Sequence, residues 1–100
     1  MASTLYRADG TKETIAPANG SHWTLEELQA LVGGYIEVLR TLSGRYMVVD
    51  EEGKLKNKPI NRVASATYFF TGHDLVVGDA VVVDTLAEMN GPEEVDDENA

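Results

Sequence analysis

Three carboxylates, Glu37, Asp50 and Glu52, come closest in this chain to a set of residues that could do chemistry together. All three belong to the stretch YIEVLRTLSGRYMVVDEEGK, whose alternating apolar residues on either side of Ser43-Gly44 predict two strands joined by a two-residue turn. In the register that this turn sets, Glu37 faces Asp50 across the hairpin. Because two like charges in such a pair repel each other, we expect a cation beside them.

If that cation is a metal ion, the acids form a binding site. If it is a lysine or arginine side chain, they form a solvated salt-bridged face. Carboxylate oxygens suit a hard divalent metal ion, but DEEG lacks the alternating acid spacing of a calcium-binding loop, and no histidine joins the set. Lys54, Lys56 and Arg62 follow closely in the sequence. Salt bridges, with Lys54 or Arg62 as the first candidates to hold Glu37, are therefore preferred over a metal site.

The other reactive side chains predict no catalytic centre. Cysteine is absent, His22 and His73 are isolated from other reactive residues in the sequence, and neither Ser43 nor Ser65 lies in a nucleophile-elbow motif. We therefore expect no catalytic residue, no metal ion and no cofactor.

The first half of the chain contains clear signals for the elements that must position these side chains. STLYRAD and TKETIA, on either side of Asp9-Gly10, predict a short hairpin. Thr24 and Glu27 have the spacing of a capping box, so a helix begins there, and Gly33 is suited to end it. In the next hairpin, alternation assigns to the core face Ile36, Val38, Leu42, Met47 and Val49, and the acids to the other face.

The second half predicts one more helix and one more strand. Asn61 can cap a helix over RVASATYFF, with Val63, Ala66 and Phe70 as its buried stripe. The run LVVGDAVVVD then predicts a central strand covered on both faces. The expected fold is α+β, with a mainly antiparallel sheet of about five strands and two helices in a single compact domain.

Composition limits the classes of protein to which the chain can belong. One hundred residues with 43% hydrophobic side chains suffice for one domain with a core. No segment has the roughly 20 apolar residues that a membrane span needs, and MASTLYRADG does not read as a signal peptide. Together with the absence of cysteine, these features lead us to expect a cytoplasmic protein that is not bound to a membrane.

The net charge of −9 is unevenly distributed. The last ten residues hold five acids and no base, so they contribute −5, and residues 1–90 contribute the remaining −4. We expect residues 1–90 to form the domain and residues 91–100 to be a disordered acidic tail. Basic residues are few and scattered, which argues against nucleic acid as a partner.

Several of these segments together resemble a small family of uncharacterised domains encoded largely by bacteriophages, plasmids and actinobacterial genomes. The family pattern has Val-Gly-Gly-Tyr-Ile-Glu, then Asn-Glu-Glu-Gly-Lys, then Asn, and then Gly-Asp before small apolar residues. In this chain the pattern falls on Val32 to Glu37, Glu51 to Lys54, Asn61 and Gly78-Asp79, so the resemblance covers about residues 23–83. Asp50 is a departure, because the family usually has Asn there. The resemblance implies a shared fold and a phage or mobile-element origin, and no particular activity.

These observations favour a non-catalytic binding protein of a phage or mobile element that acts on a host protein in host takeover or counter-defence. The alternative is a binder of a small polar or nucleotide-like ligand, held by Tyr35, Glu37, Lys54 and Asn61. An enzyme is disfavoured, because no nucleophile, base and orienting residue can be assembled. A homo-oligomer is compatible with either binding class. Exposed aromatic residues would favour the protein binder, and a polar pocket at the carboxylate end of the hairpin would favour the ligand binder.

Overall fold

The structure, a computed structural model, describes residues 3–67 and 75–85. The elements in these ranges are β1 (Ser3–Tyr6), β2 (Lys12–Ile15), α1 (Leu25–Val32), β3 (Ile36–Arg40), β4 (Tyr46–Asp50), α2 (Arg62–Thr67) and β5 (Ala80–Val83). Their order agrees with the order predicted from the sequence. The predicted tail over residues 91–100, together with Phe70 and His73, lies outside the described residues.

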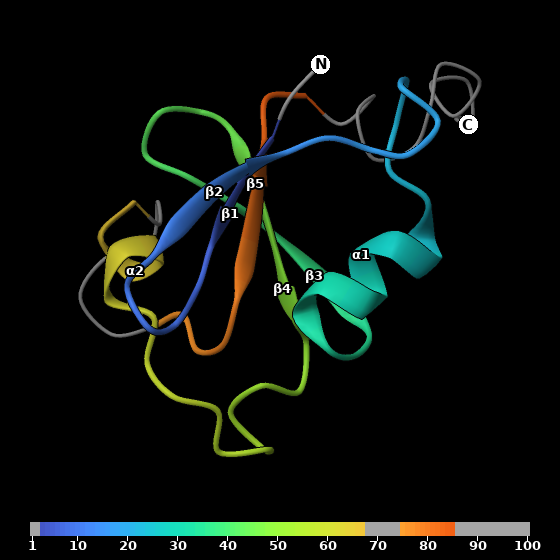
Figure 1. The fold of residues 1–100 in the computed structure, drawn as a ribbon. Helices are drawn as coiled ribbons and strands as arrows, with labels where there is room; N and C mark the ends of the chain where they lie inside the picture. Colours follow the sequence, from blue (N-terminus) through green and yellow to red (C-terminus); the bar gives the residue numbers. More distant parts are fainter. Residues whose placement is uncertain (1–2, 68–74, 86–100) are drawn as a thin grey trace, which may run out of the picture.

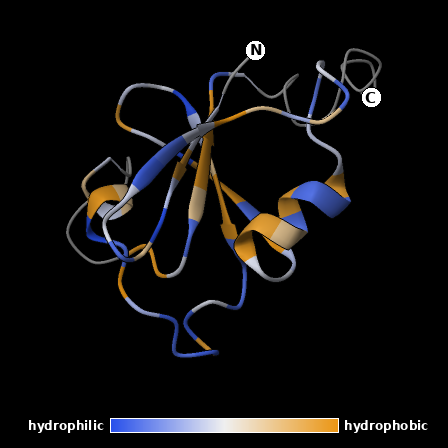
Figure 2. Ribbon diagram, in the orientation of Figure 1, coloured by the Kyte–Doolittle hydropathy of each residue, from blue (hydrophilic) through white to orange (hydrophobic). Residues whose placement is uncertain are grey.

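The five strands form one sheet in the order β2-β1-β5-β4-β3, and every neighbouring pair is antiparallel. Helix α1 packs on one face of the sheet and α2 on the other (Figure 1). The expected α+β fold is therefore confirmed. Strand β5 lies in the middle of the sheet, and all four of its residues are buried, as its consecutive valines predict. Figure 2 shows the same contrast in hydropathy, with apolar central strands and a hydrophilic β2 at one edge.

Both hairpins turn through three-residue loops that end in a left-handed glycine. In β3–β4, the Thr41 amide donates to the Arg45 carbonyl at 2.9 Å and the Gly44 amide donates to the Thr41 carbonyl at 3.0 Å, with φ of 88° at Gly44. Gly10 closes the β1–β2 loop in the same way, with φ of 97°. The predicted two-residue turn at Ser43-Gly44 is therefore wrong. The Thr41 hydroxyl accepts a hydrogen bond from the Arg45 amide at 3.0 Å and stabilises the longer loop.

The longer loop shifts the β3–β4 register by one residue. Ile36 faces Asp50, and Glu37 faces Val49. Neighbouring residues of a strand point to opposite faces of the sheet. A shift of one residue therefore places each side chain of β3 on the same face as the other set of β4 side chains. Ile36 lies on the α1 face with Val48, whereas Val49 lies on the α2 face. The predicted core face, which placed Ile36 and Val49 together, is therefore wrong, and β4 is buried on both of its faces.

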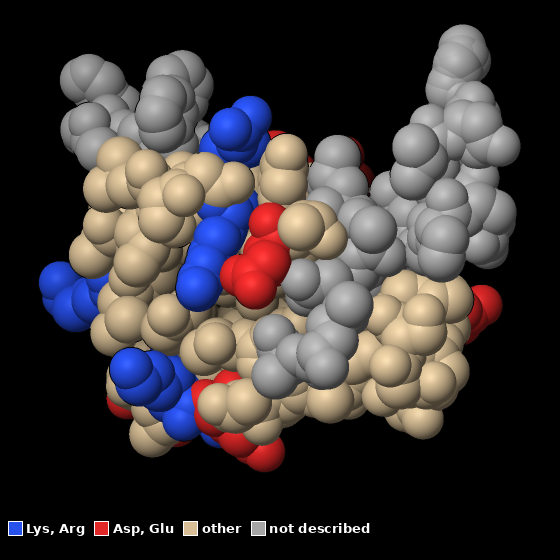
Figure 3. All heavy atoms as spheres, turned by 90° about the horizontal axis from the view of Figure 1, so that it is seen from above, with Lys and Arg blue, Asp and Glu red and all other residues tan. Residues whose placement is uncertain are grey.

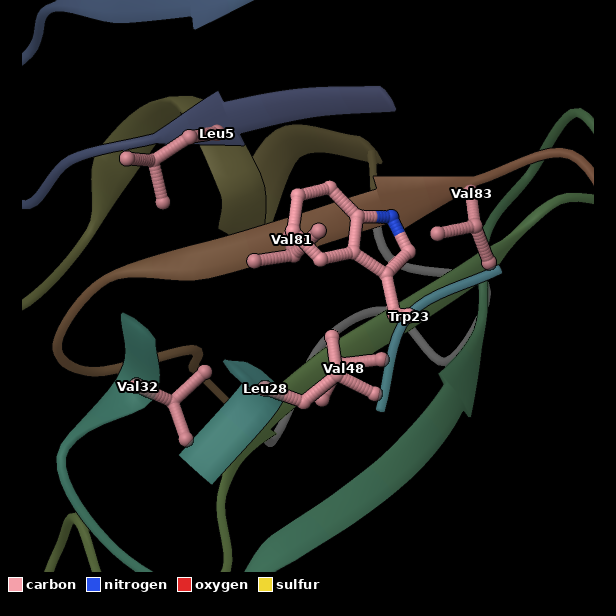
Figure 4. Packing of buried hydrophobic residues seen from close by; sticks show 7 residues of the cluster. All are labelled: Leu5, Trp23, Leu28, Val32, Val48, Val81 and Val83. Carbon is pink, nitrogen blue, oxygen red and sulfur yellow. The ribbon is translucent and has the colours of Figure 1, made fainter. Parts of the chain in front are cut away.

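The core on the α1 face is built around Trp23 (Figure 4). The capping box of Thr24 and Glu27 is present and fixes the start of α1, so that Trp23, just before the cap, and Leu28 enter the same cluster. The indole Nε1 of Trp23 donates to the Ser3 hydroxyl at 2.9 Å, which pairs the polar atom of this buried ring. The predicted end of α1 is confirmed as well, because Gly33 adopts a left-handed φ of 87°.

The core on the α2 face differs from the predicted stripe. Ala64 is fully buried among Met47, Val82 and their neighbours, whereas Val63 is 40% exposed and Ala66 is exposed. The physical reason lies in the cap, since Asn61 is tied to the sheet by its side chain and accepts the Ala64 amide at 3.0 Å. This contact turns Ala64, three residues after the cap, toward the sheet.

Candidate functional site

The three carboxylates do not form one site. Since Ile36 faces Asp50, Glu37 projects from the α2 face of the sheet, whereas Asp50 projects from the α1 face. Glu52 is exposed in the turn after β4, where its amide donates to Asp50 Oδ1 at 2.8 Å. The expected repulsion between Glu37 and Asp50 is thus absent. Among the described residues, no group of three potential ligands could hold a metal ion.

The buried Asp50 lies at the centre of a cluster of charges. Its side chain is 1% exposed, and its Oδ2 lies 2.8 Å from Lys56 Nζ and 2.7 Å from Lys58 Nζ. Burial raises the pKa of this carboxyl, but the hydrogen bonds from Lys56, Lys58 and the Glu52 amide outweigh burial and lower the pKa from 3.8 to about 2. The expectation that a lysine holds the acids is correct in kind. The predicted partners, Lys54 or Arg62 beside Glu37, are wrong, because the charge that is held belongs to Asp50.

The same two lysines cap the C-terminus of α1. Lys58 Nζ donates to the Val32 carbonyl at 2.6 Å, and Lys56 Nζ donates to the Gly33 carbonyl at 3.1 Å. Positive charge is favourable at this end of a helix, where carbonyl groups lack intrahelical partners. A Cβ on Gly34 would lie 2.5 Å from Lys56 Nζ and 2.8 Å from Oδ1 of the buried Asp50, so a side chain there would force the cluster to shift. The Asp50 cluster therefore joins α1 to the turn after β4 and serves the fold.

Asn61, one of the predicted ligand-binding residues, is also used inside the fold. It is 0% exposed, and its Nδ2 donates to the Tyr6 carbonyl at 2.9 Å and to the Gly78 carbonyl at 2.8 Å. Its Oδ1 accepts the Ala64 amide. Both amide hydrogens are thus engaged, and the side chain ties the end of β1 and the approach to β5 to the first turn of α2.

Glu37 and Lys54, two further predicted residues, line one cavity of about 270 Å³ at the carboxylate end of the β3–β4 hairpin. Glu51 adds a second charge of the same sign as Glu37, and Leu39 and Val49 form part of the apolar lining. The fourth predicted residue, Tyr35, lies instead on a shallow hollow that Gln29, Gly34 and Lys56 also line, with 67% of the tyrosine exposed. The structure therefore brings together two of the four predicted residues.

Comparison with protein-family models decides the family to which the chain belongs. The model of DUF3846, a domain of unknown function, matches residues 4–99. The chain belongs to the DUF3846 family. Comparison with curated proteins and with solved structures gave no match.

In the described part of the DUF3846 domain, strand β3 forms an open edge of the sheet. The Thr41 amide donates to Arg45 and the Glu51 amide donates to Tyr35, so the odd-numbered residues of β3 form the hydrogen-bonded pairs with β4. In an antiparallel ladder the alternate residues point their N–H and C=O groups away from the partner strand. Those of Ile36, Val38 and Arg40 therefore point outward, and no other strand in the described ranges pairs with them.

Both ends of this open stretch are closed. The Leu42 amide donates to the Thr67 carbonyl at 2.8 Å, and the Gly34 amide donates to the Gln29 carbonyl at 3.1 Å. The open edge of the DUF3846 domain is therefore limited to β3, Ile36–Arg40. Hydrophobic side chains are exposed along and beside it, with Val38 at 41%, Leu42 at 57% and Tyr35 at 67%.

The opposite edge of the sheet, β2, is more polar than β3. Its sequence KETI has one apolar residue, and its first three residues are exposed and polar. Lysine and other charged residues on an edge strand discourage pairing with a second chain. Sequence reasoning missed the β3 edge because strand order is needed to find it. The signal that was available is the contrast in composition between KETI and IEVLR.

Proposed function

We propose that this DUF3846 domain is a non-catalytic binding protein, encoded by a phage or other mobile element, that binds a host protein in the bacterial cytoplasm by accepting one of its strands at β3. The observation that carries this proposal is the outward-facing ladder of Ile36, Val38 and Arg40. An extended segment that pairs with such an edge gains main-chain hydrogen bonds and contacts with alternate side chains. The exposed Tyr35 and Leu42 extend the contact area beyond the strand.

A binding role is also supported by the way in which the polar side chains of the domain are used. Asp50 is engaged by two lysines, and Asn61 by three backbone groups. The Ser65 hydroxyl accepts the Val76 amide at 2.8 Å, and the Asp79 carboxylate accepts the Ala8 amide at 3.0 Å. These groups connect elements of the fold, which leaves the sheet edge as the surface best suited to a partner.

The test compares the two sheet edges. Val38→Lys places a charge on the open β3 edge, and Thr14→Lys is the matched control, because Thr14 is an exposed residue of the β2 edge strand. We expect wild type and Thr14→Lys to retain the same protein from a bacterial lysate and Val38→Lys to lose it. Hydrogen exchange of the purified complex should show new protection of the Val38 and Arg40 amides. Equal retention by all three proteins, with no new protection on β3, would refute binding at this edge.

A second candidate function rests on the cavity of about 270 Å³ that Glu37 and Lys54 line. Its charged lining suits a small polar ligand better than an apolar one. A panel of nucleotides and small amines should then contain a compound that raises the melting temperature of wild type and of Val38→Lys but not of Lys54→Ala. A compound that stabilises Lys54→Ala equally well would bind elsewhere.

A further inference from the structure

We infer that the strand accepted by β3 belongs to a different protein, runs antiparallel to β3, and carries an acidic residue opposite Arg40 and a basic residue opposite Glu37. This inference rests on the proposed function, and it names the chemistry of the partner. It follows from the positions of the two charges on β3.

The two charged residues of β3 project from opposite faces of the sheet. Glu37 faces Val49 on the α2 side, and Arg40 faces Tyr46 on the α1 side. Both are exposed. Glu37 has no salt bridge with any residue in the described ranges, and there Arg40 contacts the Tyr46 ring, 5.4 Å from its centroid, rather than a carboxylate. Each charge is thus available to a side chain directly opposite on an added strand, where opposite charges attract.

A second copy of this chain cannot satisfy both charges. Two β3 strands that pair antiparallel through their outward groups must align even-numbered residues with even-numbered ones, because only Ile36, Val38 and Arg40 point outward. Odd-numbered residues then face odd-numbered ones, so Glu37 of one copy never faces Arg40 of the other. Some registers even place Glu37 opposite Glu37. Charge complementarity therefore favours a different chain.

The length and direction of the partner strand also follow from β3. The engaged amides of Gly34 and Leu42 limit the open stretch to the five residues of β3. Antiparallel addition continues the ladder of the sheet and is the more stable pairing per residue. From its N-terminus, the partner strand then has an acidic residue opposite Arg40, two apolar residues opposite Leu39 and Val38, and a basic residue opposite Glu37.

Synthetic cyclic β-hairpins test this chemistry, because a preformed strand avoids the entropic cost of ordering a free peptide. One hairpin presents Glu-Leu-Val-Lys on its free edge, a second presents Lys-Leu-Val-Glu, and a third repeats the first with N-methylated amides on that edge. We expect the first to bind the wild-type domain about tenfold more tightly than the second, as two cross-strand charge pairs allow, and the third not to bind. The double variant Glu37→Lys/Arg40→Glu should invert the preference, whereas the β2-edge control Lys12→Glu should not change it.

The outcomes separate this inference from the proposed function. Equal binding of the first two hairpins, with loss of binding on N-methylation, would overturn the charge pattern but leave strand addition at the edge intact. Preference for Lys-Leu-Val-Glu would show parallel addition and overturn the inferred direction. If no hairpin binds, the inferred partner chemistry is wrong, while the comparison of Val38→Lys with Thr14→Lys still decides the proposed function.

Discussion

At the scale of single residues, burial separates the two acids that the sequence placed together. Asp50 is buried and receives hydrogen bonds from two ammonium groups and a backbone amide, so its charge contributes to stability. Glu37 is exposed on the opposite face of the sheet and forms no salt bridge with the described residues; an exposed charge costs little there and is available to a partner. Identical chemistry therefore has a structural role at one position and a proposed binding role at the other.

Asp50 predicts a component of stability that is lost in acid. Its folded pKa of about 2 lies below the ordinary value of 3.8, so the unfolded chain takes up the proton first as the pH falls. The contribution, about 2 kcal/mol, is complete above pH about 5 and disappears between pH about 4 and 2. We expect Asp50→Asn to lose about this amount at pH 7 and to show a weaker dependence on pH in denaturant titrations. Glu37→Gln, the exposed control, should change the free energy of unfolding by less than about 1 kcal/mol.

At the scale of elements, the C-terminus of α1 and the turn after β4 stabilise each other. The carbonyls of Val32 and Gly33 at the end of the helix accept hydrogen bonds from Lys58 and Lys56, respectively. Both lysines also form salt bridges with Asp50. The arrangement needs a residue without a side chain at Gly34, because a Cβ there would also lie 2.8 Å from Asp50 Oδ1. One cluster thus orients a helix, a strand end and the beginning of the open edge.

Gly34→Ala should destabilise the domain by about 1–3 kcal/mol, the usual cost of forcing an extra methyl group into an occupied space. The cost should be smaller in a Lys56→Ala background, where the ammonium group that lies nearest the new Cβ is absent. Urea denaturation of the four proteins of this double-mutant cycle measures the difference. Additive effects would show that Lys56 does not occupy the space beside Gly34.

At the scale of the whole molecule, the described surface carries charges of both signs. On the face seen in Figure 3, acidic and basic side chains lie next to each other, and neither sign forms a broad field. The chain has a net charge of −9. In the described part of the molecule, no helix is long and apolar enough to cross a membrane. The mixture of charges on the face in Figure 3 suits recognition by shape, main-chain pairing and individual charge pairs.

The charge distribution predicts that the protein does not bind duplex DNA at physiological salt. Phosphate binding requires clustered lysine and arginine side chains that displace counterions, and here two of the lysines, Lys56 and Lys58, are already paired with Asp50. Fluorescence anisotropy with a labelled duplex should show no micromolar binding at about 0.15 M salt. Binding of that strength that weakens steeply with added salt would contradict this expectation.

The sequence by itself determined those features of the domain that depend on neighbours in the chain. The capping box at Thr24 and Glu27, the left-handed end of α1 at Gly33, the first hairpin and the buried valines of β5 are local signals, and each is confirmed. They suffice for the fold class, because the periodicity and the caps fix the kind and order of the elements. Local signals of this kind did not identify all of the residues proposed for binding.

Only the tertiary structure decided the register of β3 and β4, the partners of the buried charge and the location of the open edge. The register follows from a loop one residue longer than predicted, to which the Thr41 hydroxyl contributes a hydrogen bond, and this loop places Glu37 opposite Val49 rather than Asp50. Lys58, which the spacing did not single out, reaches Asp50 and Val32 only because α1 packs beside the end of β4. Strand order, finally, is a matter of long-range pairing: the consecutive valines of AVVV already predicted a central strand, but the place of IEVLR at an edge depends on which strands pair with each other and is not encoded in its own local pattern.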